Sequence, residues 1–281
     1  MHKPDTDFLY MTSTSIPIPP KDYPRDYKNI SVAENPKSVA GSSDIVITML
    51  PSGKPVREVT LGDNGLIYGF KPGSLLLDTS SSEPQLTIET ATALKEKGID
   101  MVDAPVSGAQ WGAEAAELVF MVGGENESVS RVSPILNTMG NRIFHLGPIG
   151  SGHTMKSINN LITAMTFLAT AEGLIIGKKS GLDPEVMTDV LNESTGMSWI
   201  SQTQIKQRII SRKFDDPFKL ALMYKDVKIA INMAKELGLD LPLVLKGRET
   251  WEMAAQFTDK GASISDMVKY VEAKTDTKIE K

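Results

Sequence analysis

The chain has 281 residues, 41% of them hydrophobic and 23% charged, and its formal net charge is -5. The length predicts one large or two ordinary globular domains. The mildly acidic balance argues against nucleic acid or an anionic membrane as a partner, and no apolar run approaches the roughly 20 residues that span a bilayer. The chain has no Cys and only three His, so disulfides and thiolate metal sites are excluded and a zinc enzyme is not expected.

Pro recurs in residues 1–28, including Ile16-Pro-Ile-Pro-Pro20. Because Pro disfavours helices and central strands, this segment is predicted to be an extended leader. Between residues 29 and 146, strands are expected at 44–50, 74–78, 101–104, 118–122 and 142–146, and helices at 84–97 and 128–139. This alternation predicts a doubly wound α/β sheet with buried parallel strands.

The strand pattern ends after Gly152. Apolar residues recur at helical spacing from Met155 to Leu168, and Asp183 and Pro184 are typical of a helix start. Further helices are expected at about 184–193, 198–211, 217–237, 242–257 and 263–273. Residues 147–281 are therefore predicted to form an all-α domain. Its long apolar helix is hard to cover within one chain, so we expect a homo-oligomer.

Lys156 and Asn160 lie four residues apart at the head of this helix, and hence on one of its faces. Partial burial near the helix N-terminus would lower the pKa of Lys156 and suit it to proton transfer. Alternatively it is an ordinary solvated lysine. Asn160 would orient Lys156 or bind substrate, or it is a satisfied polar residue within a helical bundle. The preceding Gly147, Gly150 and Gly152 would provide a flexible entry into the helix.

Two other pairs of residues are candidates. Ser107 and Gly108 follow a predicted strand, where ligands gather in open α/β sheets, and they would hold a carboxylate. The alternative is a plain strand-to-loop turn. Lys225 and Asp226 adjoin an apolar helical face, and without other information they are best interpreted as an exposed charge pair on a surface helix.

Taken together and in this order, these motifs resemble the β-hydroxyacid dehydrogenase family from about residue 29 to 275. The matching segments are Met49-Leu-Pro-Ser52, Asp78-Thr-Ser80, Asp103-Ala-Pro-Val-Ser-Gly108, Phe120-Met-Val-Gly-Gly124, Gly150-Ser-Gly152, Lys156 through Asn160, Ser180-Gly-Leu-Asp-Pro184, Ser194-Thr-Gly-Met-Ser-Trp199 and Lys225-Asp226. Within the family, the stretch from Thr195 to Trp199 most resembles the branch that oxidises 3-hydroxyisobutyrate to methylmalonate semialdehyde in valine catabolism.

The resemblance implies a role for each candidate. Lys156 would be the general acid/base that takes the hydroxyl proton as hydride leaves for the nicotinamide, and Asn160 would assist. Ser107 and Gly108 would hold the carboxylate of a small-molecule hydroxy acid. The implied cofactor-binding residues are Leu50, Pro51, Ser81, Lys225 and Asp226. The implied cofactor is NAD, with NADP as the alternative, and the implied compartment is mitochondrial, with the cytoplasm as the alternative.

The sequence also departs from the family. Its members start with a strand, a Gly-x-Gly-x-x-Gly turn and a helix, which carry the pyrophosphate, and residues 1–28 resemble none of these. We therefore expect an incomplete doubly wound, Rossmann-like domain that binds NADH weakly. Ala109 replaces the second family glycine after Ser107, and Pro55 replaces a frequent polar nucleotide contact. Two alternatives stay open, namely an NADPH-dependent semialdehyde or glyoxylate reductase of the same family and a non-enzymatic dimerisation protein derived from it.

Overall fold

The computed structural model describes residues 8–10 and 30–281, which fold into two compact units. Unit one contains the described residues up to Gly108 together with Gly112–His153, and unit two contains Ala109–Trp111 and Thr154–Lys281. Of the predicted leader 1–28, only β1 (Phe8–Tyr10) is described, and it pairs in parallel with β2 (Ile30–Val32) in a two-stranded sheet. The rest of the leader lies outside the described residues.

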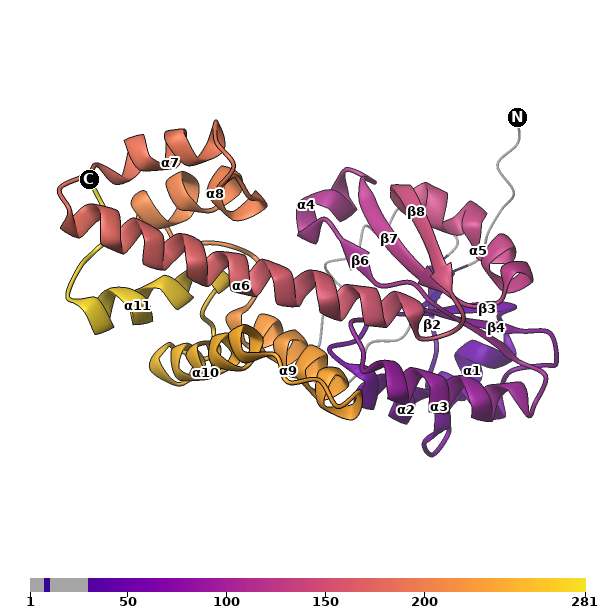
Figure 1. The fold of residues 1–281 in the computed structure, drawn as a ribbon. Helices are drawn as coiled ribbons and strands as arrows, with labels where there is room; N and C mark the ends of the chain where they lie inside the picture. The colour runs from indigo at the N-terminus through magenta and orange to yellow at the C-terminus, as the bar shows by residue number, and fades with distance from the viewer. Residues whose placement is uncertain (1–7, 11–29) are drawn as a thin grey trace. The chain divides into compact units, whose positions relative to one another are not determined.

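Unit one is built on a six-stranded sheet in the order β3-β4-β5-β7-β6, with β8 paired to β7 (Figure 1). Its strands are β3 (Ile45–Thr48), β4 (Leu75–Asp78), β5 (Asp100–Asp103), β6 (Val106–Ser107), β7 (Leu118–Gly123) and β8 (Gly140–Gly147). Its helices are α1 (Pro36–Gly41), α2 (Gly53–Leu61), η1 (Leu66–Tyr68), α3 (Pro84–Lys95), α4 (Ala109–Glu114, shared with unit two) and α5 (Asn126–Met139). The predicted doubly wound class and its five strands are confirmed.

One part of the sheet differs from the predicted parallel arrangement. β3, β4 and β5 are parallel, as are β7 and β8, but β7 runs antiparallel to both β5 and β6. The chain turns back after β6 at Gly108, whose φ of 134° lies in a region that glycine adopts at little cost. Because of this turn, β7 returns alongside β6 instead of crossing over the sheet.

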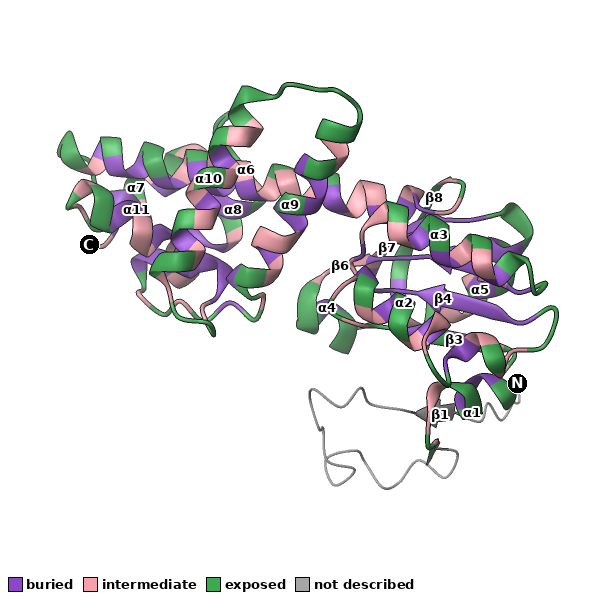
Figure 2. Ribbon diagram, turned by 90° about the horizontal axis from the view of Figure 1, so that it is seen from below, coloured by how far each residue is buried: buried purple, intermediate pink, exposed green. Residues whose placement is uncertain are grey.

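The segment Leu75–Leu77 of β4 is apolar because both faces of the sheet are covered there. Leu75 and Leu77 of β4 pack with residues of α5 on one face, whereas Leu76 packs with residues of α1 and α3 on the other. All three leucines have no exposed surface, so β4 is a fully buried strand (Figure 2).

Unit two consists of helices around a single hydrophobic core. They are α6 (Ser151–Lys179, which begins in unit one), α7 (Pro184–Asn192), α8 (Trp199–Thr203), the π-helical segment η2 (Ile205–Ile210), α9 (Leu220–Glu236), α10 (Pro242–Phe257), η3 (Ile264–Asp266) and α11 (Met267–Thr275). The predicted helix 198–211 is broken, since the amide of Ile209 bonds to the carbonyl of Gln204 five residues back. The other predicted helices are confirmed.

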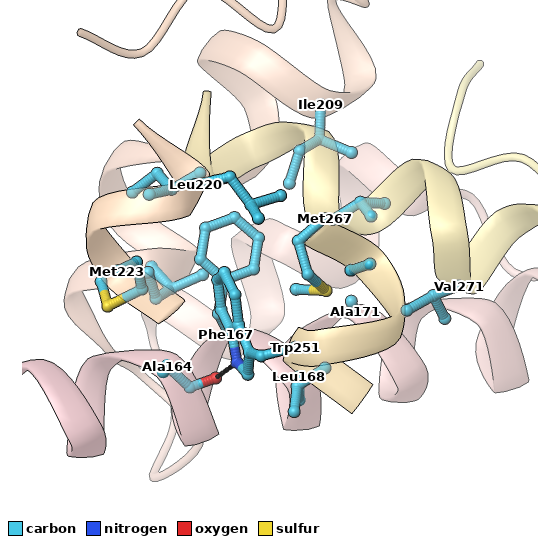
Figure 3. Packing of buried hydrophobic residues seen from close by; sticks show 14 of the residues in the cluster. Ala164, Phe167, Leu168, Ala171, Ile209, Leu220, Met223, Trp251, Met267 and Val271 are labelled. Carbon is cyan, nitrogen blue, oxygen red and sulfur yellow. Dashed lines mark hydrogen bonds between the residues drawn. The ribbon is translucent and has the colours of Figure 1, made fainter. Parts of the chain in front are cut away.

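The core of unit two centres on Trp251 of α10. Its ring meets Phe167 of α6 edge to face, with ring centres 6.2 Å apart and planes at 87°. Its indole Nε1–H donates to the carbonyl of Ala164 at 3.1 Å, so the one polar atom of this buried side chain is satisfied (Figure 3). This contact joins α10 to the middle of α6.

Helix α6 is long and apolar enough to cross a membrane by length and composition, with a mean hydropathy of 1.4 over its best window. The core helix of a globular unit meets the same criteria. Its buried side chains, including Ala164, Phe167 and Ala171, belong to the core of unit two, while Ile162 and Ile176 are exposed. Packing within unit two therefore accounts for one face of this helix.

Candidate functional site

The best-organised group of candidate residues lies in unit two, where α6 faces α9. Asn160 donates through Nδ2 to Oδ2 of Asp226 at 2.5 Å, and Nζ of Lys225 lies 3.0 Å from Oδ1 of the same carboxylate. Asn160 and Asp226 are 4% and 2% exposed. Since Asp226 is buried and joined to Asn160, the interpretation of Lys225 and Asp226 as an exposed surface pair is wrong.

Lys156 is partly buried one turn before Asn160. Burial lowers the pKa of its ammonium from the ordinary 10.5; the charge of Asp226 partly opposes this shift, and the charge of Lys225 adds to it. A lysine with a lowered pKa loses its proton closer to neutral pH, as a general base must. The carboxylate of Asp226 thus influences both the amide of Asn160 and the amine of Lys156.

The candidate substrate loop lies in unit one. Ser107 ends β6 and pairs with Val119 of β7, and both Ser107 and Gly108 are partly exposed. A Cβ at Gly108 would lie 3.1 Å from Cδ2 of Leu118, and the following Ala109 has a φ of 54°. Two successive residues with positive φ make this turn tight, and Ala109 holds its left-handed conformation without the freedom of glycine.

Leu50, Pro51 and Ser81 lie at the carboxyl ends of β3 and β4, the edge where open α/β sheets bind nucleotides. Pro51 is exposed and Leu50 and Ser81 are partly exposed, while the neighbouring Met49 is 66% exposed. An apolar surface beside a hydroxyl fits the ring and ribose of a dinucleotide.

Among the residues that the structure describes, the helix N-terminus at this edge is already occupied by a side chain. The N-terminus of α2 is capped by a side chain, because the amide of Gly53 donates to Oε2 of Glu83 at 3.1 Å. An internal carboxylate thereby takes the place that a phosphate oxygen occupies at a free helix N-terminus. The sequence contains no Gly-x-Gly-x-x-Gly turn. The residues present therefore fit the rings of NAD(P) better than its pyrophosphate.

The three glycines before Lys156 have different roles. Gly147 and Gly150 have φ values of 135° and 90°, which other residues rarely adopt. Gly152 instead lies inside the first turn of α6, where a Cβ would be 2.3 Å from the carbonyl oxygen of Met121 and 2.8 Å from Oδ2 of Asp103. At Gly152 the structure requires close backbone approach, so the interpretation of all three as a flexible entry is wrong.

Sequence reasoning missed a second polar group, formed by Asp78, Asp103 and His153 in unit one. All three side chains have no exposed surface. The two aspartates end the successive strands β4 and β5, a position that could have drawn attention to them, whereas histidine was considered only as a metal ligand. Within residues 8–10 and 30–281, no group of His, Asp or Glu side chains is arranged to hold a metal ion.

Two family models match consecutive parts of the chain. Residues 22–147 match the family described as the NAD binding domain of 6-phosphogluconate dehydrogenase, and residues 150–271 match the family described as NAD-binding of NADP-dependent 3-hydroxyisobutyrate dehydrogenase. The fold is thus that of a nicotinamide-dinucleotide-binding α/β unit followed by a helical unit.

Individual relatives place the chain more closely. It is 36% identical over 219 residues to 2-(hydroxymethyl)glutarate dehydrogenase of Eubacterium barkeri, covering 78% of this chain and 73% of that protein. It is 34% identical over 241 residues to mitochondrial 3-hydroxyisobutyrate dehydrogenase of Rattus norvegicus, covering 84% and 71%. The solved structure of 3-hydroxyisobutyrate dehydrogenase from Mycobacterium tuberculosis with L-serine is 28% identical, with a TM-score of 0.79, covering 86% and 84%. The chain belongs to the β-hydroxyacid dehydrogenase family, whose members are NAD(P)-dependent oxidoreductases.

Proposed function

We propose that this protein oxidises 3-hydroxyisobutyrate to methylmalonate semialdehyde with NAD, as a step of valine catabolism. The observation that carries the proposal is the lowered pKa of Lys156 beside the buried Asn160–Asp226 pair. The names of the Rattus and Mycobacterium relatives support the choice of substrate. The name of the Rattus relative also supports a mitochondrial location.

Lys156 acts as the proton acceptor in this proposal. Its neutral amine takes the proton of the substrate hydroxyl while the bonding pair of the adjacent C–H leaves as hydride, so that a C=O bond forms. When bound, the nicotinamide supplies the hydride acceptor. The ammonium that results on Lys156 stabilises negative charge on the carbonyl oxygen, and it donates the proton in the reverse direction.

The other candidates position the substrate. Ser107, through its hydroxyl, and Gly108, through its backbone, hold the substrate carboxylate. Asn160 holds the reacting oxygen, and its amide is oriented by the hydrogen bond to Asp226. Lys225 contributes charge beside the cofactor. Leu50, Pro51 and Ser81 contact the nucleotide at the edge of the sheet.

We further propose that the chain functions as a homo-oligomer. The exposed face of α6 carries Ile162 and Ile176, which are 59% and 68% exposed. Burying such apolar side chains against a second copy is favourable at about 25 cal/mol per Å².

Turnover tests the main proposal. The purified chain is assayed for reduced nicotinamide at 340 nm with 3-hydroxyisobutyrate, L-serine or 2-(hydroxymethyl)glutarate, each with NAD+ and NADP+. Lys156→Met should lower kcat about 10²–10⁴-fold, the usual contribution of general acid–base catalysis. The matched control is Lys179→Met, an exposed lysine on the same helix, which should retain wild-type turnover.

The possible outcomes separate the alternatives. Faster reduction of glyoxylate or a semialdehyde with NADPH would favour a reductase of the same family. Turnover of none of these compounds would favour the non-enzymatic alternative. A Lys156→Met variant within a few-fold of the wild type would exclude the assigned role of this amine.

A further inference from the structure

The buried network around His153 connects four separate segments of unit one. The backbone amides of Gly150 and His153 donate to the two carboxylate oxygens of Asp103, both at 2.7 Å. The imidazole Nε2 lies 3.0 Å from the carbonyl oxygen of Ser80, and Nδ1 lies 2.8 Å from Oγ1 of Thr87. The first turn of α6 is therefore bonded to the end of β5, to the loop after β4, and to α3.

The partners of the ring fix the proton on Nε2. A backbone carbonyl only accepts hydrogen bonds, so Nε2 carries the proton that is donated to Ser80. Nδ1 is bonded to the hydroxyl of Thr87, which also lies 3.2 Å from the carbonyl oxygen of Glu83. Both ring nitrogens are thereby satisfied in one orientation. Asp78 Oδ2 lies 3.7 Å from Nε2 and Asp103 Oδ2 lies 3.7 Å from Nδ1, one carboxylate near each nitrogen.

Ser80 is the residue through which this network reaches the nucleotide edge. Its amide donates to Oδ1 of Asp78 at 3.1 Å, and its carbonyl accepts from His153. Its hydroxyl in turn accepts the amide of Leu50 at 2.8 Å. Asp78 is held by Thr48 as well, at 2.9 Å. Ser80 is thus fixed at three points, and the loop after β3 is fixed to it.

We propose that His153 is a positioning residue for the NAD(P) edge of unit one. Through Ser80 it holds the amide of Leu50, and hence the loop carrying Leu50 and Pro51, in the arrangement that binds the nucleotide. It does so from the same helical turn whose amides are bonded to Asp103. Within the described residues, these side chains form no group arranged to hold a metal ion, so metal binding does not explain the contacts.

The composition of the network supports positioning over simple packing. Asp78, Asp103 and His153 have no exposed surface, and buried polar groups generally stabilise a fold less than apolar residues of the same volume. A fully satisfied buried network does, however, select one arrangement of the segments that it joins. Here the joined segments are the first turn of α6, the end of β5, α3, and the loops after β3 and β4.

Amide exchange tests the proposal without any substrate or cofactor. The exchange rate of the Leu50 amide is measured by NMR in the wild type and in four variants. His153→Leu removes both ring bonds and Ser80→Ala removes the acceptor of Leu50, and each should accelerate Leu50 exchange about tenfold or more. His153→Gln restores a donor near the position of Nε2 and should return most of the protection. Thr87→Val breaks the bond to Nδ1 and the hydroxyl's bond to the carbonyl of Glu83 but keeps the bond from Nε2 to Ser80, so it should leave Leu50 exchange near the wild-type rate.

A second measurement rests on the proposed function. With NAD+ as the varied substrate, His153→Leu should raise KM about tenfold while kcat changes less than twofold. The Kd for NADH, measured by titration, should rise by the same factor. Leu50 exchange at the wild-type rate in His153→Leu would overturn the proposal, as would an equal acceleration in Thr87→Val. If the wild type turns over no hydroxy acid, the proposed function fails, while the exchange rates still decide the role of His153. If His153→Leu does not fold, His153→Asn replaces it, because the shorter amide keeps a polar group near Nδ1 but none near Nε2; it should also accelerate Leu50 exchange, and a wild-type rate would overturn the proposal.

Discussion

Gly152→Ala tests the close approach of α6 to the sheet of unit one. The new Cβ would lie 2.3 Å from the carbonyl oxygen of Met121 and 2.9 Å from that of Asp103. Both are backbone atoms of strands β5 and β7, so the first turn of α6 must move away. That movement breaks the bonds of Gly150 and His153 to the Asp103 carboxylate. Hydrogen bonds to charged groups contribute about 1.5–3 kcal/mol each, so the loss of both should reach about 3–6 kcal/mol.

The assay for Gly152→Ala is urea unfolding followed by circular dichroism. All three Trp lie in unit two, so tryptophan fluorescence reports separately on that unit. A loss of this size is a large share of the roughly 5–15 kcal/mol that stabilises an ordinary domain. The matched control is Gly173→Ala on the same helix, which meets nothing within 4 Å and should gain up to about 1 kcal/mol. A Gly152→Ala chain within 1 kcal/mol of the wild type would refute the packing argument.

Three further predictions concern the substrate loop, the lysine and the exposed helix face. Ala109→Gly should raise the free energy of unfolding by up to about 1 kcal/mol, because alanine at a φ of 54° is strained. A lower urea midpoint than that of the wild type would contradict this. Asp226→Asn removes a charge that raises the pKa of Lys156, so the acid limb of the pH profile of kcat/KM should shift to lower pH; a shift to higher pH would refute the assignment. The double variant Ile162→Glu with Ile176→Glu should have a lower molar mass than the wild type in analytical ultracentrifugation. A wild type that sediments as a monomer would exclude the proposed homo-oligomer.

Much of the fold could be predicted because its signals are local. The buried strand β4 appears as a continuous apolar run, and Asp183 caps α7 by accepting the amides of Glu185 and Val186. Helix α2, which contains Pro55, was not predicted. In the first turn of a helix, however, Pro costs little, since its missing N–H would have no partner there.

The sites were harder to predict because their contacts join distant segments. Lys156 and Asn160 were found from helical spacing, but the bond from Asn160 to Asp226 spans 66 residues and leaves no local pattern. The contact from His153 to Ser80 spans 73 residues, and it involves a backbone carbonyl that no residue type reveals. The antiparallel return of β7 depends on the connection from Gly108 to Glu117, which begins with two residues of positive φ and contains α4, and periodicity does not resolve it.

The position of Trp251 gives the helical unit an intrinsic optical probe. Its indole has no exposed surface and borders Phe167, whereas Trp111 and Trp199 are 45% and 49% exposed. An indole in an apolar surrounding emits at shorter wavelength and is shielded from dissolved quenchers. Acrylamide should therefore remove the red-shifted part of the emission first and leave a blue component from Trp251 that disappears only when α6 and α10 separate.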